Sequence, residues 1–544
     1  MAATSHPTGA FGHPRGLMTL FFTEMWERFS YYGMRAFLVL YITTSTAKGG
    51  LGESDATGGI IYAMYGSLAY LLGVPGGWLA DRYLGQRKAV LIGGIIIMLG
   101  HITLALPTGA AFFPGLGLIV LGTGLLKPNV STIVGQLYAK DDVRRDAGYT
   151  IFYMGINLGA AVAPFICGFM AKTDTFRGWL VDRGIDPNAS WHFGFGAAAV
   201  GMAFGVLQFW RGQKHLGEAG LRPHRPEPVP GASTGIPPAA LAIAGGAAAI
   251  VAAFWIWRLS DGVDKAGIAD GFGVTLLSTA IALFLVMHKV VARDVGERRR
   301  VRAMAVLFFG CMAFFGVFEQ AGSSINLFTD RFVERELFFV EFDATYYQSV
   351  NAAWILLLGP VFAWLWIRLA KARKEPDAVK KFALGVFLSG VAFLPLIPQV
   401  AEIALGHRIS GAWLVFGYYL IITCAELCLS PVGLSAMNRL APVHMASLIM
   451  GTWFFASATG NFVAGMIAAA TGSEAASGEG AGKQVVLDVY WQIGWIAIGV
   501  GVAVLVVSPL IKKLMHLDTL SDDDALAGEG IGEPQAAGVH PAAQ

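Results

Sequence analysis

The sequence Phe22-Thr-Glu-Met-Trp-Glu-Arg-Phe-Ser-Tyr-Tyr-Gly-Met-Arg35 decides the fold class, because it places four charges inside an otherwise apolar run. That run extends from about residue 17 to residue 43, and a helix needs roughly 20 residues to cross a bilayer. On a helix that turns by about 100° per residue, the charged side chains and Tyr31 occupy an arc of roughly 100°. The charges of this stripe belong to Glu24, Glu27, Arg28 and Arg35.

A charged stripe on a membrane helix has to face protein or water. A charge that faces lipid near the bilayer centre costs about 2.5–3.5 kcal/mol on insertion scales. Two interpretations are open: structural ion pairs, for which Glu24 and Arg28 have the favourable i,i+4 order, or a polar lining with a function. We favour the lining, because structural pairing needs only one such pair.

The composition indicates a protein that crosses the membrane many times. Of the 544 residues, 55% are hydrophobic and 14% are charged, with a mean hydropathy of +0.58, whereas soluble domains carry about 25% charged residues. The net charge of +2 gives no indication of a nucleic-acid partner. We expect no cleaved signal peptide, because the first apolar run is charged. The four cysteines lie in apolar runs, so we expect neither disulfides nor a metal site.

Apolar runs predict an all-α membrane protein with about 14 helices, in two sets of six with two more between them. The expected segments are a cytoplasmic N-terminal segment at 1–16, a six-helix bundle at 17–211, a cytoplasmic linker at 212–237, two inserted helices with a basic loop at 238–301, a second six-helix bundle at 302–515 and a disordered cytoplasmic tail at 516–544.

Basic residues gather in alternate loops, and this pattern sets the expected orientation. Clusters such as Arg82–Lys88 and Arg293–Arg302 lie on one side of the membrane if both termini are cytoplasmic. Two six-helix halves joined by a long cytoplasmic loop form the outline of the major facilitator fold, which places its site at the midplane between the halves.

A loop motif agrees with this outline. The segment Gly77-Trp-Leu-Ala-Asp-Arg-Tyr-Leu-Gly-Gln-Arg-Lys88 resembles the motif shared by major facilitator transporters, with one extra residue between Arg82 and Gly85. An ordinary basic loop is the alternative, but the full pattern favours the superfamily. The resemblance implies a role in conformational locking and no contact with substrate.

Five further segments resemble signatures of the proton-dependent oligopeptide transporter family, from about residue 17 to 515. Any one would be weak evidence, but all five occur in the family's order. They are Glu24-x-x-Glu27-Arg28-Phe29-x-Tyr31-Tyr32-Gly33, Gly122-Thr-Gly124-Leu-Leu-Lys127-Pro128-Asn129, Phe152-Tyr153-Met-Gly-Ile156-Asn157-Leu-Gly159, Phe318-Glu319-Gln320-x-Gly322-Ser323 and Glu426-x-x-x-Ser430-Pro431-x-Gly433, with Trp453 fitting the eleventh span.

The resemblance implies a role for each matched residue. Proton coupling would rest on Glu24, Glu27 and Glu319. Alternating ion pairs would join Arg35 to Glu319 and Lys127 to Glu426. The implied substrate-binding residues are Arg28, Tyr31, Arg35, Tyr70, Lys127, Asn157, Asn326, Glu426, Ser430 and Trp453. For Asn157 and Asn326 a bridge between helices is an alternative; Asn326 is assigned because it follows Glu319 by seven residues on the same helix face.

The distribution of intramembrane charge supports a zwitterionic substrate. The cations Arg28, Arg35 and Lys127 lie in the N-terminal half, whereas Glu319 and Glu426 lie in the C-terminal half. A peptide across the midplane would present its carboxylate to the cations and its ammonium to Glu426 in charge-assisted hydrogen bonds. With Glu24 and Glu27 included, four carboxylates stand against three cations, so pairing leaves one carboxylate over, and such a group can carry a proton.

One departure from the family changes the expected route of the proton. Mammalian members carry a functional histidine in the second span, and the corresponding residue here is Ala63. Coupling would therefore rest on the glutamates. His101 in the third span is interpreted as a packed histidine.

The sequence thus predicts proton-coupled uptake of di- and tripeptides across the cytoplasmic membrane, with peptide-like drugs as further ligands. We expect a monomer in the lipid bilayer, no cofactor other than protons, and no enzymatic activity. A carrier of nitrate, another small anion or an amino acid is the alternative within the superfamily. A receptor or scaffold that does not transport is the alternative in another class; it would not need charged linings in both halves.

Overall fold

The computed structural model describes residues 9, 12–138, 142, 144–221, 223, 237–261, 264–334, 336–337, 339–396, 398, 407–440, 446–471 and 479–515. The chain is almost entirely helical in these ranges, with one two-stranded hairpin, β1 Glu336–Leu337 and β2 Val340–Glu341. The predicted tail at 516–544 and most of the predicted linker at 212–237 lie outside the described residues.

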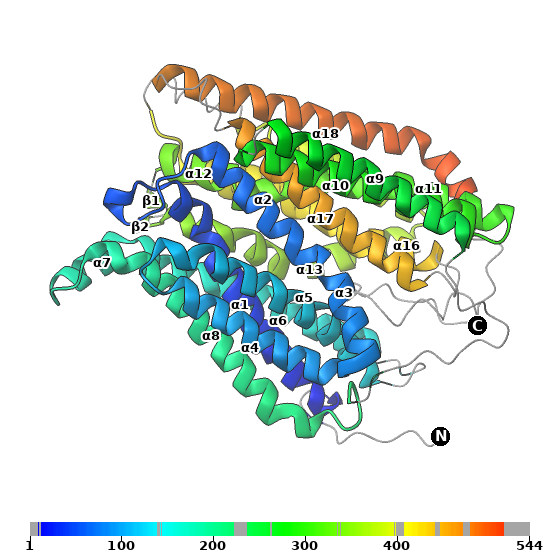
Figure 1. The fold of residues 1–544 in the computed structure, drawn as a ribbon, viewed down its shortest axis with the longest axis horizontal. Helices are drawn as coiled ribbons and strands as arrows, with labels where there is room; N and C mark the ends of the chain where they lie inside the picture. The colour runs from blue at the N-terminus through cyan, green and yellow to red at the C-terminus, as the bar shows by residue number, and fades with distance from the viewer. Residues whose placement is uncertain are drawn as a thin grey trace.

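Two bundles of long helices lie side by side (Figure 1). The first contains α1 Arg15–Thr43, α2 Asp55–Leu71, α3 Gly73–Leu79, α4 Gln86–Leu104, α5 Phe112–Gln136, α6 Arg145–Lys172, α7 Asp174–Val181 and α8 Ser190–Gly212. The second contains α11 Val295–Phe318, α12 Ser324–Phe332, α13 Gln348–Lys371, α14 Ala378–Val391, α16 Leu420–Leu440, α17 Ala446–Thr471 and α18 Glu479–Met515. Between them in sequence come α9 Pro238–Asp261 and α10 Lys265–Val286.

Short polar side chains fix several helix starts. The Ser54 hydroxyl accepts a hydrogen bond from the Thr57 N–H at 3.2 Å and so caps α2. Asp294 caps α11 in the same way by accepting from the Glu297 N–H at 2.8 Å. These caps satisfy donors that the first turn of a helix leaves unpaired.

Twelve helices in the described ranges are long and apolar enough to cross a membrane. α1 is outside this set because of the charges it carries, and α14 is outside it because it has 14 residues. The membrane-spanning, all-helical class is therefore confirmed. The expected total of about 14 spans and the cytoplasmic placement of both termini stay predictions.

The seventh major span differs from the single helix predicted at about 302–333. α11 ends at Phe318, a 3₁₀ turn (η8) covers Glu319–Gly322, and the backbone at Ser323 has φ −120° and ψ −98° before α12 begins. The break turns the residues after Ser323 onto a different face from those before it.

The two bundles meet along α2 with α17 and along α6 with α13. Small residues allow a close approach at the first contact. A Cβ added to Gly465 of α17 would lie 2.0 Å from the Cβ of Ala63 on α2. Ala63 itself is fully buried, so this position has no room for a histidine.

The inserted helices lie at the edge of the C-terminal bundle (Figure 1). α10 packs on α9 and makes smaller contacts with α2 and α17; its Phe272 ring meets Phe462 of α17 with centroids 5.4 Å apart. Most of α9 is exposed, including Ile250 and Ile256. An apolar, exposed surface of this kind suits contact with lipid.

Candidate functional site

A cavity of about 340 Å³ lies between the two bundles. Its wall is formed by α1, α2, α5 and α6 from the N-terminal half and by α11, η8, α13, α16 and α17 from the C-terminal half. Ligand pockets commonly have volumes of about 300–1,000 Å³. Ten of the sequence-predicted residues line it: Glu24, Arg28, Arg35, Tyr70, Lys127, Asn157, Glu319, Glu426, Ser430 and Trp453.

The charged stripe of α1 forms a buried cluster beside this cavity. Arg28 Nε lies 3.0 Å from Glu24 Oε1 and also donates a hydrogen bond to Glu27. All three side chains are buried, but only Glu24 and Arg28 reach the cavity wall. Arg28 Nη2 is buried and has no hydrogen-bond partner among the described residues. The cluster therefore leaves one guanidinium donor available to an anionic ligand.

A second buried ion pair joins the two halves. Arg35 Nη2 of α1 lies 2.6 Å from Glu319 Oε2, which stands at the start of the turn between α11 and α12. The guanidinium also lies 5.9 Å from the Tyr62 ring centroid. This predicted pair is formed, and it depends on Gly322, since a Cβ there would lie 2.0 Å from Tyr62 Oη and 2.6 Å from Arg35 Nε.

Lys127 contributes a third cation to the N-terminal wall. It precedes Pro128 within α5, and its Nζ lies 3.7 Å from the centroid of the Tyr70 ring. Lys127 and Tyr70 both line the cavity. A lysine over an aromatic face gains a favourable cation–π interaction, which holds this ammonium at the wall of the cavity.

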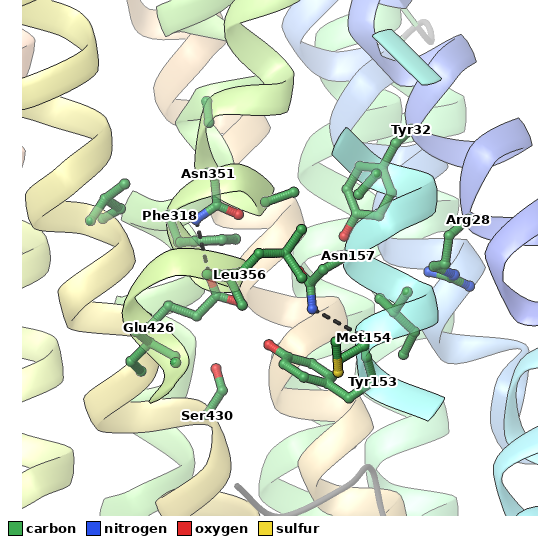
Figure 2. A pocket seen from close by; sticks show the side chains of 18 of the residues that line it. Arg28, Tyr32, Tyr153, Met154, Asn157, Phe318, Asn351, Leu356, Glu426 and Ser430 are labelled. Carbon is green, nitrogen blue, oxygen red and sulfur yellow. Dashed lines mark hydrogen bonds between the residues drawn. The ribbon is translucent and has the colours of Figure 1, made fainter. Parts of the chain in front are cut away.

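The C-terminal wall carries the opposite charge. Glu426 of α16 accepts a hydrogen bond from Asn351 Nδ2 of α13 at 3.0 Å. Figure 2 shows these two residues facing Asn157 and Arg28 across the cavity. Asn157 donates to the Tyr153 carbonyl oxygen one turn earlier in α6, at 3.1 Å.

Two residues assigned to the site from sequence lie elsewhere. Tyr31 does not line the cavity; its ring stacks on Tyr65 with centroids 6.3 Å apart, and Tyr32 takes the place at the wall. Asn326 donates to the Ala36 carbonyl oxygen at 2.8 Å and so joins α12 to α1. The same-face argument for Asn326 was wrong, because the helix breaks at Ser323.

Sequence reasoning also missed lining residues, among them Tyr32, Gln348 and Asn351. Asn351 had a usable signal, since it is an amide close to the start of an otherwise apolar span. A polar residue within such a span is expensive unless it meets protein or water. His101, by contrast, is buried in α4, is not among the residues that line the cavity, and has no hydrogen-bond partner on either ring nitrogen among the described residues.

Ion pairs close one end of the interface between the halves. Lys172 at the end of α6 pairs with Asp330 of α12 and lies 3.8 Å from Asp343. Arg331 pairs with Asp55 of α2 at 2.5 Å. This end holds α7, α12 and the hairpin and lies opposite the start of α1 and the end of α18 (Figure 1). The cavity wall instead includes Ala363 in the second half of α13, so it extends toward the end where α1 begins and α18 ends.

A cavity with charged side chains on both walls, placed between two bundles of membrane-spanning helices, is typical of solute transporters of the major facilitator type. The family model described as the POT family matches residues 87–484. The chain belongs to this family, the proton-dependent oligopeptide transporters. It is thus a multi-pass transporter of the cytoplasmic membrane and not an enzyme.

Named relatives and solved structures agree with this assignment. The chain is 39% identical to the uncharacterized transporter YclF of Bacillus subtilis over 93% of its length and 96% of the relative. It is 36% identical to a di-/tripeptide transporter of Lactococcus lactis subsp. cremoris, over 93% and 97%. A crystal structure of a peptide transporter POT in complex with sulfate superposes with a TM-score of 0.78 at 38% identity, over 94% of this chain and 98% of that chain.

Proposed function

We propose that this transporter imports di- and tripeptides by alternating access and couples their entry to protons. The observation that carries the proposal is the opposite charge of the two cavity walls, with Arg28 and Lys127 on one wall and Glu426 on the other. The Lactococcus lactis relative, named a di-/tripeptide transporter, supports the substrate class. Protons are the only coupling species that the proposal requires, and the monomer is the transporting unit.

The substrate's two charged ends define its orientation. An extended residue spans about 3.3–3.6 Å, so the ends of a di- or tripeptide lie about 7–11 Å apart. The carboxylate meets Arg28, whose Nη2 has no partner among the described residues, together with Lys127. The ammonium meets Glu426. Once the two ends of the peptide are bound, its side chains contact the tyrosines and Trp453, Ser430 and Asn157, which also line the cavity.

Proton coupling acts through the Arg35–Glu319 pair. Arg35 Nη2 and Glu319 Oε2 lie 2.6 Å apart across the two halves. Arg35 lies two turns after Arg28 in α1, and the turn that holds Glu319 leads into α12 at the closed end. Protonation of Glu319 removes its charge and weakens the link, so that this end can open. Deprotonation restores the link and closes the end again, while Glu24 and Glu27 hold Arg28 in place for the carboxylate.

A carrier of simple anions fits the site less well. Nitrate has no positive group to place against Glu426, and a buried carboxylate that faces an anion is unfavourable. Peptides satisfy both walls at once.

The experiment is uptake of labelled dialanine into liposomes that contain the purified protein, with and without an inward proton gradient. Accumulation only with the gradient supports both substrate class and coupling. Equilibration without accumulation contradicts the coupling. If no dialanine enters while the protein remains folded, the substrate assignment is wrong and nitrate is the next substrate to test.

A further inference from the structure

Asn351 of α13 uses both hydrogens of its amide group on α16. Nδ2 donates to Thr423 Oγ1 at 2.9 Å and to Glu426 Oε2 at 3.0 Å. The two acceptors are three residues apart and therefore lie on one face of the helix. One amide nitrogen thus bridges a fully buried hydroxyl and a carboxylate on the cavity wall.

Thr423 can act toward Asn351 only as an acceptor. Its hydroxyl donates to the Tyr419 carbonyl oxygen one turn earlier at 2.7 Å, and a hydroxyl has a single hydrogen to give. An ionised Glu426 carboxylate likewise only accepts. Rotating the Asn351 amide by half a turn would place its oxygen against two acceptors, so only one orientation of the amide is compatible with these neighbours.

This orientation determines what the wall offers to a ligand. Asn351 Oδ1 has no hydrogen-bond partner in the described part of the chain. Figure 2 shows the oxygen turned away from Glu426 and toward the cavity. Asn351 and Glu426 therefore present neighbouring acceptor oxygens, and the amide donors are consumed within the protein.

We propose that Thr423 is a positioning residue that fixes the Asn351 amide and thereby makes the C-terminal wall selective for a primary ammonium. A primary ammonium carries three N–H donors and can serve more than one acceptor at once. An acetylated amine has a single N–H donor and brings a carbonyl oxygen that faces acceptors. The inference rests on the proposed peptide function and adds the reason why a free amino end is preferred.

The test compares affinities for dialanine and N-acetyl-dialanine in the purified full-length protein. Thr423→Val keeps the shape of the side chain and removes the acceptor. We expect it to lower the preference for the free amine by about tenfold, the effect of one hydrogen bond lost from the bound state. Thr423→Ser, which keeps the hydroxyl, restores the preference.

A matched control separates this role from a general effect on packing. Thr459 of α17 donates to the Phe455 carbonyl oxygen at 2.8 Å in the same back-bonded geometry, and it is buried but does not line the cavity. Thr459→Val therefore removes a similar hydroxyl in the same half, and we expect the ratio of the two affinities to be unchanged. Thr423→Ala removes the same acceptor with a smaller side chain if the valine variant does not fold.

A double-substitution cycle shows whether Thr423 acts through Asn351. In an Asn351→Ala background, Thr423→Val should change the affinity ratio no further. An undiminished effect in that background, or a wild-type ratio in Thr423→Val and Thr423→Ala alone, overturns the inference. Failure of the wild-type protein to bind dialanine contradicts the proposed function instead, so the two failures are distinguishable.

Discussion

α1 and α9 are both long enough to cross the membrane, yet they differ in charge and in surroundings. α1 carries Glu24, Glu27, Arg28 and Arg35 and is buried along most of its length. α9 has no charge before Arg258 and exposes much of its surface, with Ile256 68% exposed. In a bilayer a helix keeps buried charges only where protein or water surrounds them. The comparison therefore separates the helices that form the cavity from those that face lipid.

The largest effect is expected from Arg28→Ala. The change leaves Glu24 and Glu27 buried together without their counter-ion, and breaking a buried pair from one side typically costs about 3–5 kcal/mol. Peptide uptake should fall to background and the melting temperature of the purified protein should drop. Near-normal uptake would show that the charged stripe of α1 is structural, which would remove the distinction from α9.

Glu319→Gln should remove coupling while sparing exchange. A glutamine can still accept a hydrogen bond from Arg35 but cannot ionise. Dialanine should no longer accumulate under an inward proton gradient, whereas counterflow between the two sides of the liposome continues. Retained accumulation would exclude Glu319 as the proton-carrying group. Lys127→Ala removes a contact to the carboxylate of the peptide, so in contrast it should weaken both proton-driven accumulation and counterflow.

Glu426→Gln should weaken binding of free peptides more than that of acetylated peptides. A hydrogen bond between charged groups contributes about 1.5–3 kcal/mol, so the affinity for dialanine should fall by about tenfold or more. Competition assays with both ligands measure the difference. Equal losses for the two ligands would contradict the assignment of Glu426 to the ammonium.

Lys172→Gln should have a moderate effect on the balance between conformations. Lys172 is partly exposed and links α6 to Asp330 and Asp343 at the closed end. Its loss should make this end open more often, which would increase labelling of a cysteine introduced at Ala468, a buried residue of α17 that lies against Gly59 of α2. Unchanged labelling would show that the remaining ion pairs hold this end closed without Lys172.

The smallest effect is expected on α9. Gly245 and Gly246 have open space where a side chain would be added, so Gly245→Leu should only enlarge the apolar surface toward lipid. Uptake should remain at the wild-type rate and stability should change by less than about 0.5 kcal/mol. A loss of uptake would show that α9 takes part in transport and would overturn its interpretation as a helix that only faces lipid.

The charged part of the site could be predicted from sequence because a charge in an apolar run has few permitted surroundings. That argument locates Arg28, Lys127 and Glu426 but does not separate neighbours on one helix. Tyr31 and Tyr32 differ by about 100° around α1, and packing against Tyr65 decides which one faces inward. Asn326 was misplaced because the turn at Ser323 depends on backbone angles that the apolar pattern does not encode.

Asn351 illustrates a different limit. Its amide is neutral, so the argument from buried charge does not predict where the side chain lies. Its role follows only from its distances to Thr423 and Glu426 on another helix. The pairing of residues from separate helices is a property of packing. In comparison, predicting the bounds of the membrane segments required only the lengths of the apolar runs.

The contact between Ala63 and Gly465 limits how this transporter can evolve. The two helices approach so closely there that even a Cβ at position 465 would lie 2.0 Å from the Ala63 Cβ. A histidine could enter the second span only if α17 moved away, which would require compensating changes on both helices. A larger side chain at position 63 therefore requires a compensating change on α17, so that the effects of substitutions at positions 63 and 465 depend on each other.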